Sequence, residues 1–154
     1  DGFMLASLNC KVKLVEKNPV IFALLRDGVR RLHLASAADK LLKVAYENIS
    51  YVCGDTERVL AQQKLSDMNY DVIYLDPMFP LKQKESKSKK AMQALQYLSD
   101  IEDDYNDLLN SAIDSARKRV VIKRPLRSDY LCKKEPTLSL KGSSVRFDVF
   151  IKSS

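Results

Sequence analysis

Residues 70–80 of the chain, YDVIYLDPMFP, decide the fold. The first six, Tyr70–Leu75, are rich in β-branched and aromatic side chains, which is typical of a strand. Asp76-Pro77 ends this strand, and the prolines on either side of Phe79 hold the following loop extended. The stretch therefore predicts a strand with a carboxylate at its carboxyl end, where ligands bind in α/β sheets.

Strand-like and helix-like segments alternate along the rest of the chain. The expected strands are short, and they span Lys11–Glu16, Ile49–Cys53, Tyr70–Leu75, Arg119–Lys123, Thr137–Leu140 and Val145–Ile151. The expected helices span Phe3–Leu8, a segment that starts at Asn18-Pro19, Ala37–Glu47, Glu57–Leu65, Lys89–Leu98 and Asp103–Arg117. This alternation predicts a doubly wound α/β fold, with a mainly parallel sheet covered by helices on both faces. The last two strands form an antiparallel hairpin, so the sheet is mixed.

Composition sets wide limits on the function. The chain has 154 residues, of which 45% are hydrophobic and 30% charged, and this fits a single globular domain. Its 26 Lys and Arg against 20 Asp and Glu give a net charge of +6, an excess that favours phosphate-rich partners such as nucleic acid. A protein that is merely basic explains the same excess equally well.

The cysteine and histidine content argues against several kinds of site. Three widely spaced cysteines without a C-x-x-C motif favour small core residues in a reducing, cytoplasmic compartment over a disulfide framework or a zinc knuckle. A single histidine, His33, gives little support for a metal site or a Ser–His–Asp triad, so we expect no metal. No apolar stretch approaches the roughly 20 residues of a membrane span, so we expect no membrane partner.

Acidic residues follow the first two expected strands. Glu16 ends the first strand, where a carboxylate can accept hydrogen bonds from the ribose hydroxyls of a nucleoside cofactor. The alternative is a solvated Glu16 that pairs with a neighbouring lysine. Asp55 follows the second strand, where it can accept a hydrogen bond from an adenine amine, and Thr56 can add its hydroxyl or backbone N–H. The alternative role of both residues is to cap the next helix.

The loop after Leu75 carries groups suited to the methylation of an exocyclic amine. Such an amine is a poor nucleophile because its lone pair is delocalised into the ring, so an enzyme must hold it in line with an electrophilic methyl group. The Asp76 carboxylate and the Pro77 carbonyl can accept its N–H hydrogens, and Phe79 can stack on the base. The alternative is a proline-rich strand exit with Phe79 in the core.

Two basic stretches lie next to expected strand ends. The first is a lysine-rich loop suited to the phosphates around a target nucleotide, with Lys82, Lys84, Lys87, Lys89 and Lys90. The second surrounds the fourth strand, with Lys123 and Arg124 as candidate contacts beside Lys118, Arg119 and Arg127. Both predict nucleic-acid binding, whereas a solvated loop and a stabilised helix end are the simpler alternatives.

Several motifs together resemble the bacterial RsmJ-type methyltransferases. The shared runs are DGFMLASL at 1–8, VEKNP at 15–19, YLDPMFPLKQK at 74–84, VIKRP at 121–125, and Lys141-Gly142 with Arg146-Phe147-Asp148. The resemblance covers essentially the whole chain, and D-P-M-F-P-x-K-x-K is its most specific part. Members of this family use S-adenosylmethionine to methylate the N2 amine of one guanine in small-subunit ribosomal RNA.

The resemblance implies a fold, a cofactor and a set of contacts. The order of strands and helices is that of the class I, Rossmann-like methyltransferase fold, and the cofactor is S-adenosylmethionine. The positions that match the family's cofactor contacts are Asp1, Glu16, Lys17, Asp55, Thr56 and Asp76. The family has a first strand and a glycine-rich loop before the position of Asp1, and this sequence has neither. We therefore expect residues 1–154 to be one methyltransferase domain that is incomplete at its N-terminus.

The leading hypothesis is a guanine-N2 methyltransferase acting on 16S ribosomal RNA, with ribosomal RNA or the small ribosomal subunit as its partner. Catalysis would then consist mainly of positioning by Asp76, Pro77 and Phe79. One alternative is a catalytically inactive RNA-binding module of the same fold. Another is an amine methyltransferase that acts on DNA adenine or on a protein.

Overall fold

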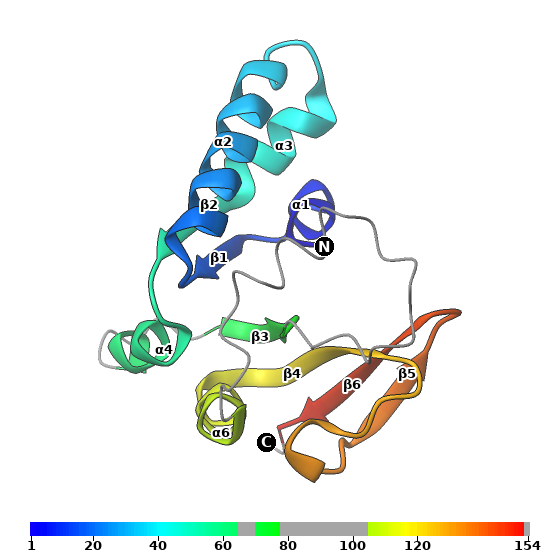
Figure 1. Cartoon of the computed structure of the whole chain (residues 1–154). Coiled ribbons are helices and arrows are strands. Elements are labelled where there is room, and N and C mark those ends of the chain that lie inside the picture. The colour runs from blue at the N-terminus through cyan, green and yellow to red at the C-terminus, as the bar shows by residue number, and fades with distance from the viewer. Residues whose placement is uncertain (65–69, 78–104, 153–154) are drawn as a thin grey trace. The chain divides into compact units, whose positions relative to one another are not determined.

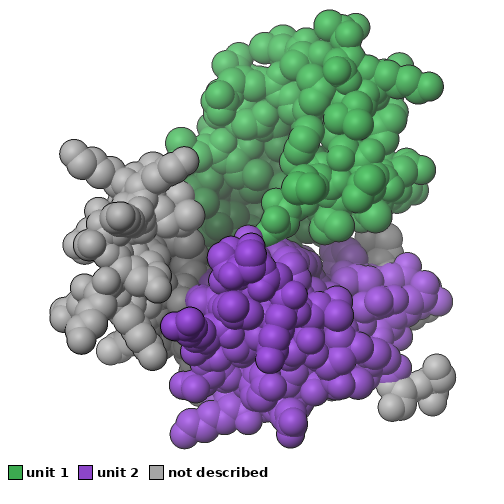
Figure 2. Space-filling model, turned by 90° about the vertical axis from the view of Figure 1, so that its right-hand side faces the viewer, with its two compact units in different colours: residues 1–56 green, residues 57–154 purple. Residues whose placement is uncertain are grey.

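The computed structural model describes residues 1–64, 70–77 and 105–152 of the chain (Figure 1). Its helices are α1 (Gly2–Ser7), α2 (Pro19–Ala35), α3 (Lys40–Asn48), α4 (Thr56–Lys64), α6 (Tyr105–Ser115) and the 3-10 turn η1 (Leu131–Lys133). Its strands are β1 (Val12–Glu16), β2 (Ile49–Cys53), β3 (Tyr70–Leu75), β4 (Ala116–Pro125), β5 (Leu138–Lys141) and β6 (Val145–Ile151). Residues 1–56 form one compact unit, unit 1, and residues 57–154 form another, unit 2 (Figure 2).

Unit 1 is built on two parallel strands joined by a pair of helices. β1 and β2 pair in parallel, with Val12 opposite Ile49 and Glu16 opposite Cys53. Parallel strands need a long crossover connection, and α2 with α3 supplies it. Because the pairing is parallel, both strands end at the same edge of the sheet.

Capping residues set where the two long helices begin. The Asn18 side chain accepts hydrogen bonds from two backbone N–H groups of α2, at 2.9 and 3.2 Å, and Pro19 occupies the first helical position. The predicted helix start at Asn18-Pro19 is therefore confirmed. The next helix begins at Lys40 rather than at Ala37, because the Asp39 carboxylate supplies its cap.

Unit 2 contains a four-stranded mixed sheet in the order β3-β4-β6-β5. β3 and β4 are parallel, β6 is antiparallel to β4, and β5 is antiparallel to β6. The predicted closing hairpin is confirmed, and its second strand is the one that lies beside the parallel pair. A mixed sheet is thus present as predicted, but it contains four of the six expected strands and only one parallel pair, because β1 and β2 pair in a two-stranded sheet of their own.

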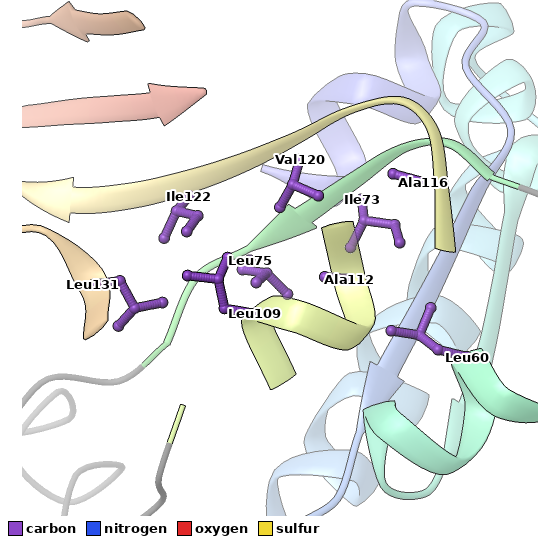
Figure 3. Close-up of a cluster of buried hydrophobic side chains, with 9 residues drawn as sticks. All are labelled: Leu60, Ile73, Leu75, Leu109, Ala112, Ala116, Val120, Ile122 and Leu131. Carbon is purple, nitrogen blue, oxygen red and sulfur yellow. The ribbon is translucent and has the colours of Figure 1, made fainter. Parts of the chain in front are cut away.

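The core of unit 2 gathers apolar side chains from the sheet and from the helices next to it (Figure 3). Its buried members are Leu60 of α4, Ile73 and Leu75 of β3, Leu109 and Ala112 of α6, Ala116, Val120 and Ile122 of β4, and Leu131 of η1. Val120 and Ile122 share this face of the sheet because side chains alternate along a strand. Leu131 ties the segment that follows β4 to the same core.

β4 begins earlier than the sequence pattern predicts. The apolar spacing predicts a helix over Asp103–Arg117, but α6 ends at Ser115 and β4 starts at the next residue. Ala116 pairs with Tyr70 of β3, so pairing between strands overrides the helical pattern at this point. The expected loop over Phe79–Lys90 and the expected helix over Lys89–Leu98 lie outside the described residues.

Candidate cofactor and substrate site

The carboxyl ends of β1 and β2 lie side by side in unit 1. Glu16 and Cys53 are the last register pair, and the Gly54 N–H donates a hydrogen bond of 3.0 Å to the Glu16 carbonyl. Two of the predicted cofactor positions, Glu16 and Asp55, therefore lie at one edge of this sheet. In α/β sheets this is the edge at which nucleotide ligands bind.

The Glu16 carboxylate is held in place by the chain itself. The side chain is half-buried, and its Oε1 accepts a hydrogen bond of 2.7 Å from the backbone N–H of Asn18. This bond uses one of the two carboxylate oxygens and fixes the direction in which the group faces. A carboxylate fixed in this way is a suitable acceptor for hydroxyl groups.

The other predicted positions of unit 1 lie next to the starts of helices α1, α2 and α4. Asp55 is exposed and directly precedes α4, whose first residue is the half-buried Thr56. The Asp1 carbonyl accepts a hydrogen bond of 3.0 Å from the Leu5 N–H, while the Asp1 side chain makes no capping bond to α1. Lys17 is exposed next to Glu16. Contacts of these four residues with a cofactor stay predictions.

An ion pair between Asp76 and Lys123 lies at the carboxyl end of β3, where the pairing of β3 with β4 stops. Leu75 and Ile122 are the last register pair of these parallel strands, so the next residue of each strand lies across from the other. The Asp76 Oδ2 and Lys123 Nζ atoms are 3.1 Å apart, and the two side chains are 50% and 28% exposed. The lysine that sequence interpretation assigns to RNA therefore contacts the predicted catalytic carboxylate.

Tyr74 of β3 is affected by the same carboxylate. Burial, and to a smaller extent the charge of Asp76, raises the pKa of the Tyr74 hydroxyl to about 12. The hydroxyl therefore keeps its proton at neutral pH, where it can donate a hydrogen bond but cannot act as a base.

Arg124, the other predicted RNA contact of β4, is buried. Its Nη2 donates a hydrogen bond of 2.6 Å to the carbonyl of Asp129. Burial, followed by the like charge of Arg146, lowers the pKa of this guanidinium. Arg124 thus has a structural contact within unit 2, and an RNA contact by this residue stays a prediction that its burial does not favour.

Several predicted residues lie outside the described part of the chain. They are Phe79, Lys82, Lys84, Lys87, Lys89 and Lys90. Pro77, the last described residue before them, is half-buried and follows Asp76 directly.

Sequence interpretation missed a buried polar network in unit 2. Arg146 and Asp148 of β6 are both buried and form an ion pair, with Arg146 Nε 2.9 Å from Asp148 Oδ1. The available signal was the alternation of β6, which places residues two apart on the same face of the strand. The sequence indicates Arg146-Phe147-Asp148 only as a motif shared with a family, and it does not indicate that Arg146 and Asp148 are buried together.

The cysteines and the histidine have no catalytic arrangement in the described residues. Cys10 and Cys53 are exposed, so their expected role as core residues is wrong, whereas Cys132 packs against the core of unit 2. Cys53 ends β2 at the sheet edge, and Cys10 follows the turn after α1, which explains their exposure. No group of three or more His, Cys, Asp or Glu side chains there is arranged to hold a metal ion. None of the described helices is long and apolar enough to cross a membrane.

A cleft of about 490 Å³ lies in unit 1 between α2, α3 and β2. Its lining consists of Val29, Arg30, His33, Tyr46, Glu47, Ile49 and Tyr51. The His33 and Tyr46 rings face each other with centroids 4.5 Å apart. None of the predicted site residues lines this cleft, so it is separate from the strand ends described above.

Known proteins resemble this chain along its whole length. The family model described as "Putative SAM-dependent methyltransferase", where SAM is S-adenosylmethionine, matches residues 1–152. Proteins named ribosomal RNA small subunit methyltransferase J from Pseudoalteromonas translucida, Cellvibrio japonicus and Haemophilus influenzae are 41%, 39% and 38% identical over 100%, 99% and 100% of this chain. The chain covers 59%, 57% and 58% of these relatives, so it spans less than two thirds of their length.

A solved structure resembles the fold as well. The crystal structure of a SAM-dependent methyltransferase from Neisseria gonorrhoeae matches with a TM-score of 0.76 and 30% identity, over 98% of this chain and 56% of that one. The match confirms the predicted class I, Rossmann-like α/β fold, and the named relatives confirm the resemblance to RsmJ-type enzymes. The chain therefore belongs to the family of putative SAM-dependent methyltransferases.

Proposed function

We propose that the intact protein transfers a methyl group from S-adenosylmethionine to the N2 amine of a guanine in 16S ribosomal RNA. The observation that carries this proposal is the Asp76–Lys123 ion pair at the carboxyl end of β3, directly before Pro77. The name shared by the relatives, ribosomal RNA small subunit methyltransferase J, supports the substrate class. Ribosomal RNA or the small ribosomal subunit is then the partner, and a reducing cytoplasm suits the free cysteines.

The strand ends of unit 1 fit the nucleoside part of S-adenosylmethionine. Glu16 offers a carboxylate already oriented by the Asn18 N–H, which is the kind of acceptor that two ribose hydroxyls need. Asp55 and Thr56 would contact the adenine amine, and the proposed set is completed by Asp1, Lys17 and Asp76. When bound, S-adenosylmethionine supplies an electrophilic methyl group.

The residues after β3 act mainly by positioning the guanine amine. The Asp76 carboxylate and the Pro77 carbonyl accept its two N–H hydrogens, and this turns the nitrogen lone pair toward the methyl group. Lys123 keeps the Asp76 carboxylate in a defined place, and Asp76 is also an acceptor for the proton that the amine loses. Phe79 would hold the base by stacking.

Basic side chains would bind the RNA around the target guanine. The proposed phosphate contacts are Lys82, Lys84, Lys87, Lys89, Lys90 and Lys123. Arg124, the other residue that the sequence suggests, is buried and donates to the Asp129 carbonyl, so we do not include it among these contacts. Lys123 also pairs with Asp76, so a phosphate and the Asp76 carboxylate would compete for the same ammonium group.

The experiment compares two matched Asp–Lys pairs on the same two strands. The Asp71–Lys118 pair, 3.2 Å long and exposed, lies at the opposite end of β3 from Asp76–Lys123. Asp76→Ala and Asp71→Ala are made in the intact protein. Cofactor binding is measured by calorimetry, and methyl transfer is measured on small-subunit RNA from cells that lack the gene.

We expect Asp76→Ala to lower the rate of methyl transfer by about 100-fold or more, and Asp71→Ala to leave it unchanged. Methylation at the wild-type rate by Asp76→Ala would show that the proposed site is wrong. An intact protein that binds RNA but not S-adenosylmethionine would be the inactive module instead. Modification of DNA adenine or of a protein, with none on the RNA, would assign the other alternative.

A further inference from the structure

The segment that follows β4, residues 126–134, is held from inside by two buried arginines; we call it the post-β4 loop. Arg146 Nη1 donates hydrogen bonds to the carbonyls of Leu126 (3.2 Å) and Ser128 (2.6 Å). Arg146 Nη2 and Arg124 Nη2 both donate to the Asp129 carbonyl, at 3.2 and 2.6 Å. Two arginines that face each other across β4 and β6 thus bind three carbonyls of one loop.

The Arg146 guanidinium is itself fixed. Its Nε lies 2.9 Å from Asp148 Oδ1 and 3.1 Å from Oδ2, and its Nη2 lies 3.1 Å from Oδ2. The Ser139 hydroxyl donates a bond of 2.6 Å to Asp148 Oδ1, and the Tyr130 ring lies 5.0 Å from the guanidinium carbon. Because every nitrogen of this planar group is engaged, its fork holds the loop in one geometry.

The second half of the loop packs into the core and contains an unusual backbone conformation. Leu131 is buried in the cluster drawn in Figure 3. The next two residues, Cys132 and Lys133, have φ angles of 54° and 55°, a left-handed conformation that residues other than glycine seldom adopt. Such backbone persists only when its surroundings determine it, and it is concentrated at binding and active sites.

The same loop exposes cationic side chains, and it follows β4, the strand that carries the partner of Asp76. Arg127, Lys133 and Lys134 are exposed. The loop starts at the carboxyl end of β4, three residues after Lys123, which contacts Asp76. A fixed loop with exposed positive charge therefore begins a few residues from the lysine that contacts the proposed catalytic carboxylate.

We propose that the post-β4 loop is a preformed binding surface for the phosphates of the RNA substrate, with Arg127 as a contact and Arg146 as the positioning residue. The inference rests on the proposed function, because it takes RNA as the partner. An arginine fork matches a phosphate in two hydrogen bonds, and a loop that is ordered in advance loses little entropy on binding. The buried network thereby serves substrate binding without touching the substrate.

Arg127→Gln tests the contact, and Arg119→Gln is its matched control. Arg119 is also an exposed arginine of the β4 region, but it lies in the first half of the strand, opposite Ile151. The intact protein is titrated with a labelled small-subunit RNA fragment at several salt concentrations. Binding of S-adenosylmethionine and methyl transfer are measured separately on the same preparations.

We expect Arg127→Gln to weaken RNA binding by roughly twofold to fivefold, and to reduce the slope of log affinity against log salt by about 1. Arg119→Gln should leave both unchanged. Equal effects of the two variants, or wild-type binding by Arg127→Gln, would overturn the proposed contact. Failure of the proposed function would show differently, as a wild-type protein that binds RNA but transfers no methyl group to it.

Arg146→Lys tests the positioning role, because lysine keeps the charge but cannot bind three carbonyls and a carboxylate together. We expect weaker RNA binding, unchanged cofactor binding, and no further loss when Arg127→Gln is added. Wild-type RNA affinity in folded Arg146→Lys would overturn the role. Ser139→Ala, which removes one bond to Asp148, is measured in parallel, and its folded protein should show a smaller loss in the same direction.

Discussion

The substitution Asp148→Ala measures how much the buried network contributes to the stability of unit 2. The Asp148 carboxylate accepts three hydrogen bonds from Arg146 and one from the Ser139 hydroxyl, and both charged residues are buried. Removal of the carboxylate leaves the guanidinium charge in the interior. Breaking a buried ion pair in this way costs about 3–5 kcal/mol, out of the roughly 5–15 kcal/mol that stabilises a typical domain.

The lower end of this range applies to Asp148→Ala. Arg146 keeps the carbonyls of Leu126, Ser128 and Asp129 as acceptors, so part of its charge stays compensated. We therefore expect the free energy of unfolding to fall by about 3 kcal/mol. With a urea m-value of about 2 kcal/mol per molar, the unfolding midpoint falls by about 1.5 M.

Urea denaturation of the intact protein, followed by circular dichroism, checks this value. Asp71→Ala is the control, because the Asp71–Lys118 pair is exposed and should contribute less than about 1 kcal/mol. The double variant Arg146→Ala/Asp148→Ala should lose less than the sum of the two single variants, since it leaves no unpaired buried charge. A midpoint for Asp148→Ala no lower than that of Asp71→Ala would refute the reasoning.

Three other predictions concern single side chains. Asn18→Ala removes the cap of α2 and should lower the free energy of unfolding by about 1 kcal/mol in urea denaturation. Leu109→Ala opens a cavity in the core of unit 2 and should lower it by about 2–5 kcal/mol in the same assay. The Tyr74 hydroxyl should ionise near pH 12 in an ultraviolet titration that uses Tyr74→Phe as the blank. Asp76→Asn should lower the pKa of Tyr74, but not to 10, because burial is the larger cause of the raised pKa. Since the folded pKa of Tyr74 is raised, its contribution to stability is present below pH 10 and is lost as the pH rises toward 12.

The bounds of a strand could be predicted where turn-forming residues follow its β-branched and aromatic residues. Ile49–Cys53 is followed by Gly54-Asp55 and Tyr70–Leu75 by Asp76-Pro77, and both strands have the predicted bounds. The start of β4 could not be predicted, because Ala116 fits the apolar spacing of a helix as well as a strand. Its pairing with Tyr70 decides between the two, and that residue is far away in the sequence.

The same holds for the site: residues adjacent in the sequence predict some of its features, and residues far away in the sequence determine the others. The position of Asp76 at a strand end follows from residues next to it in the sequence. Its partner Lys123 is 47 residues away and is found only from the register of β3 and β4. The burial of Arg124 likewise depends on Arg146, which lies opposite it on β6, so a count of basic residues near a strand end could not identify Arg124 as an interior group.

The two Asp–Lys pairs on β3 and β4 show why position along a strand matters more than composition. Asp71–Lys118 and Asp76–Lys123 have nearly equal lengths, 3.2 and 3.1 Å, and join the same two strands. Five residues of strand separate them, about 17 Å. Only the second pair lies at the carboxyl end of β3, where the chain leaves the sheet and backbone groups such as the Pro77 carbonyl are no longer used in strand pairing. The Asp71–Lys118 pair has the same charges but lacks these neighbours. If Asp76→Ala lowers the activity and Asp71→Ala does not, the position of the pair at the end of the strand, and not its charge, determines the site.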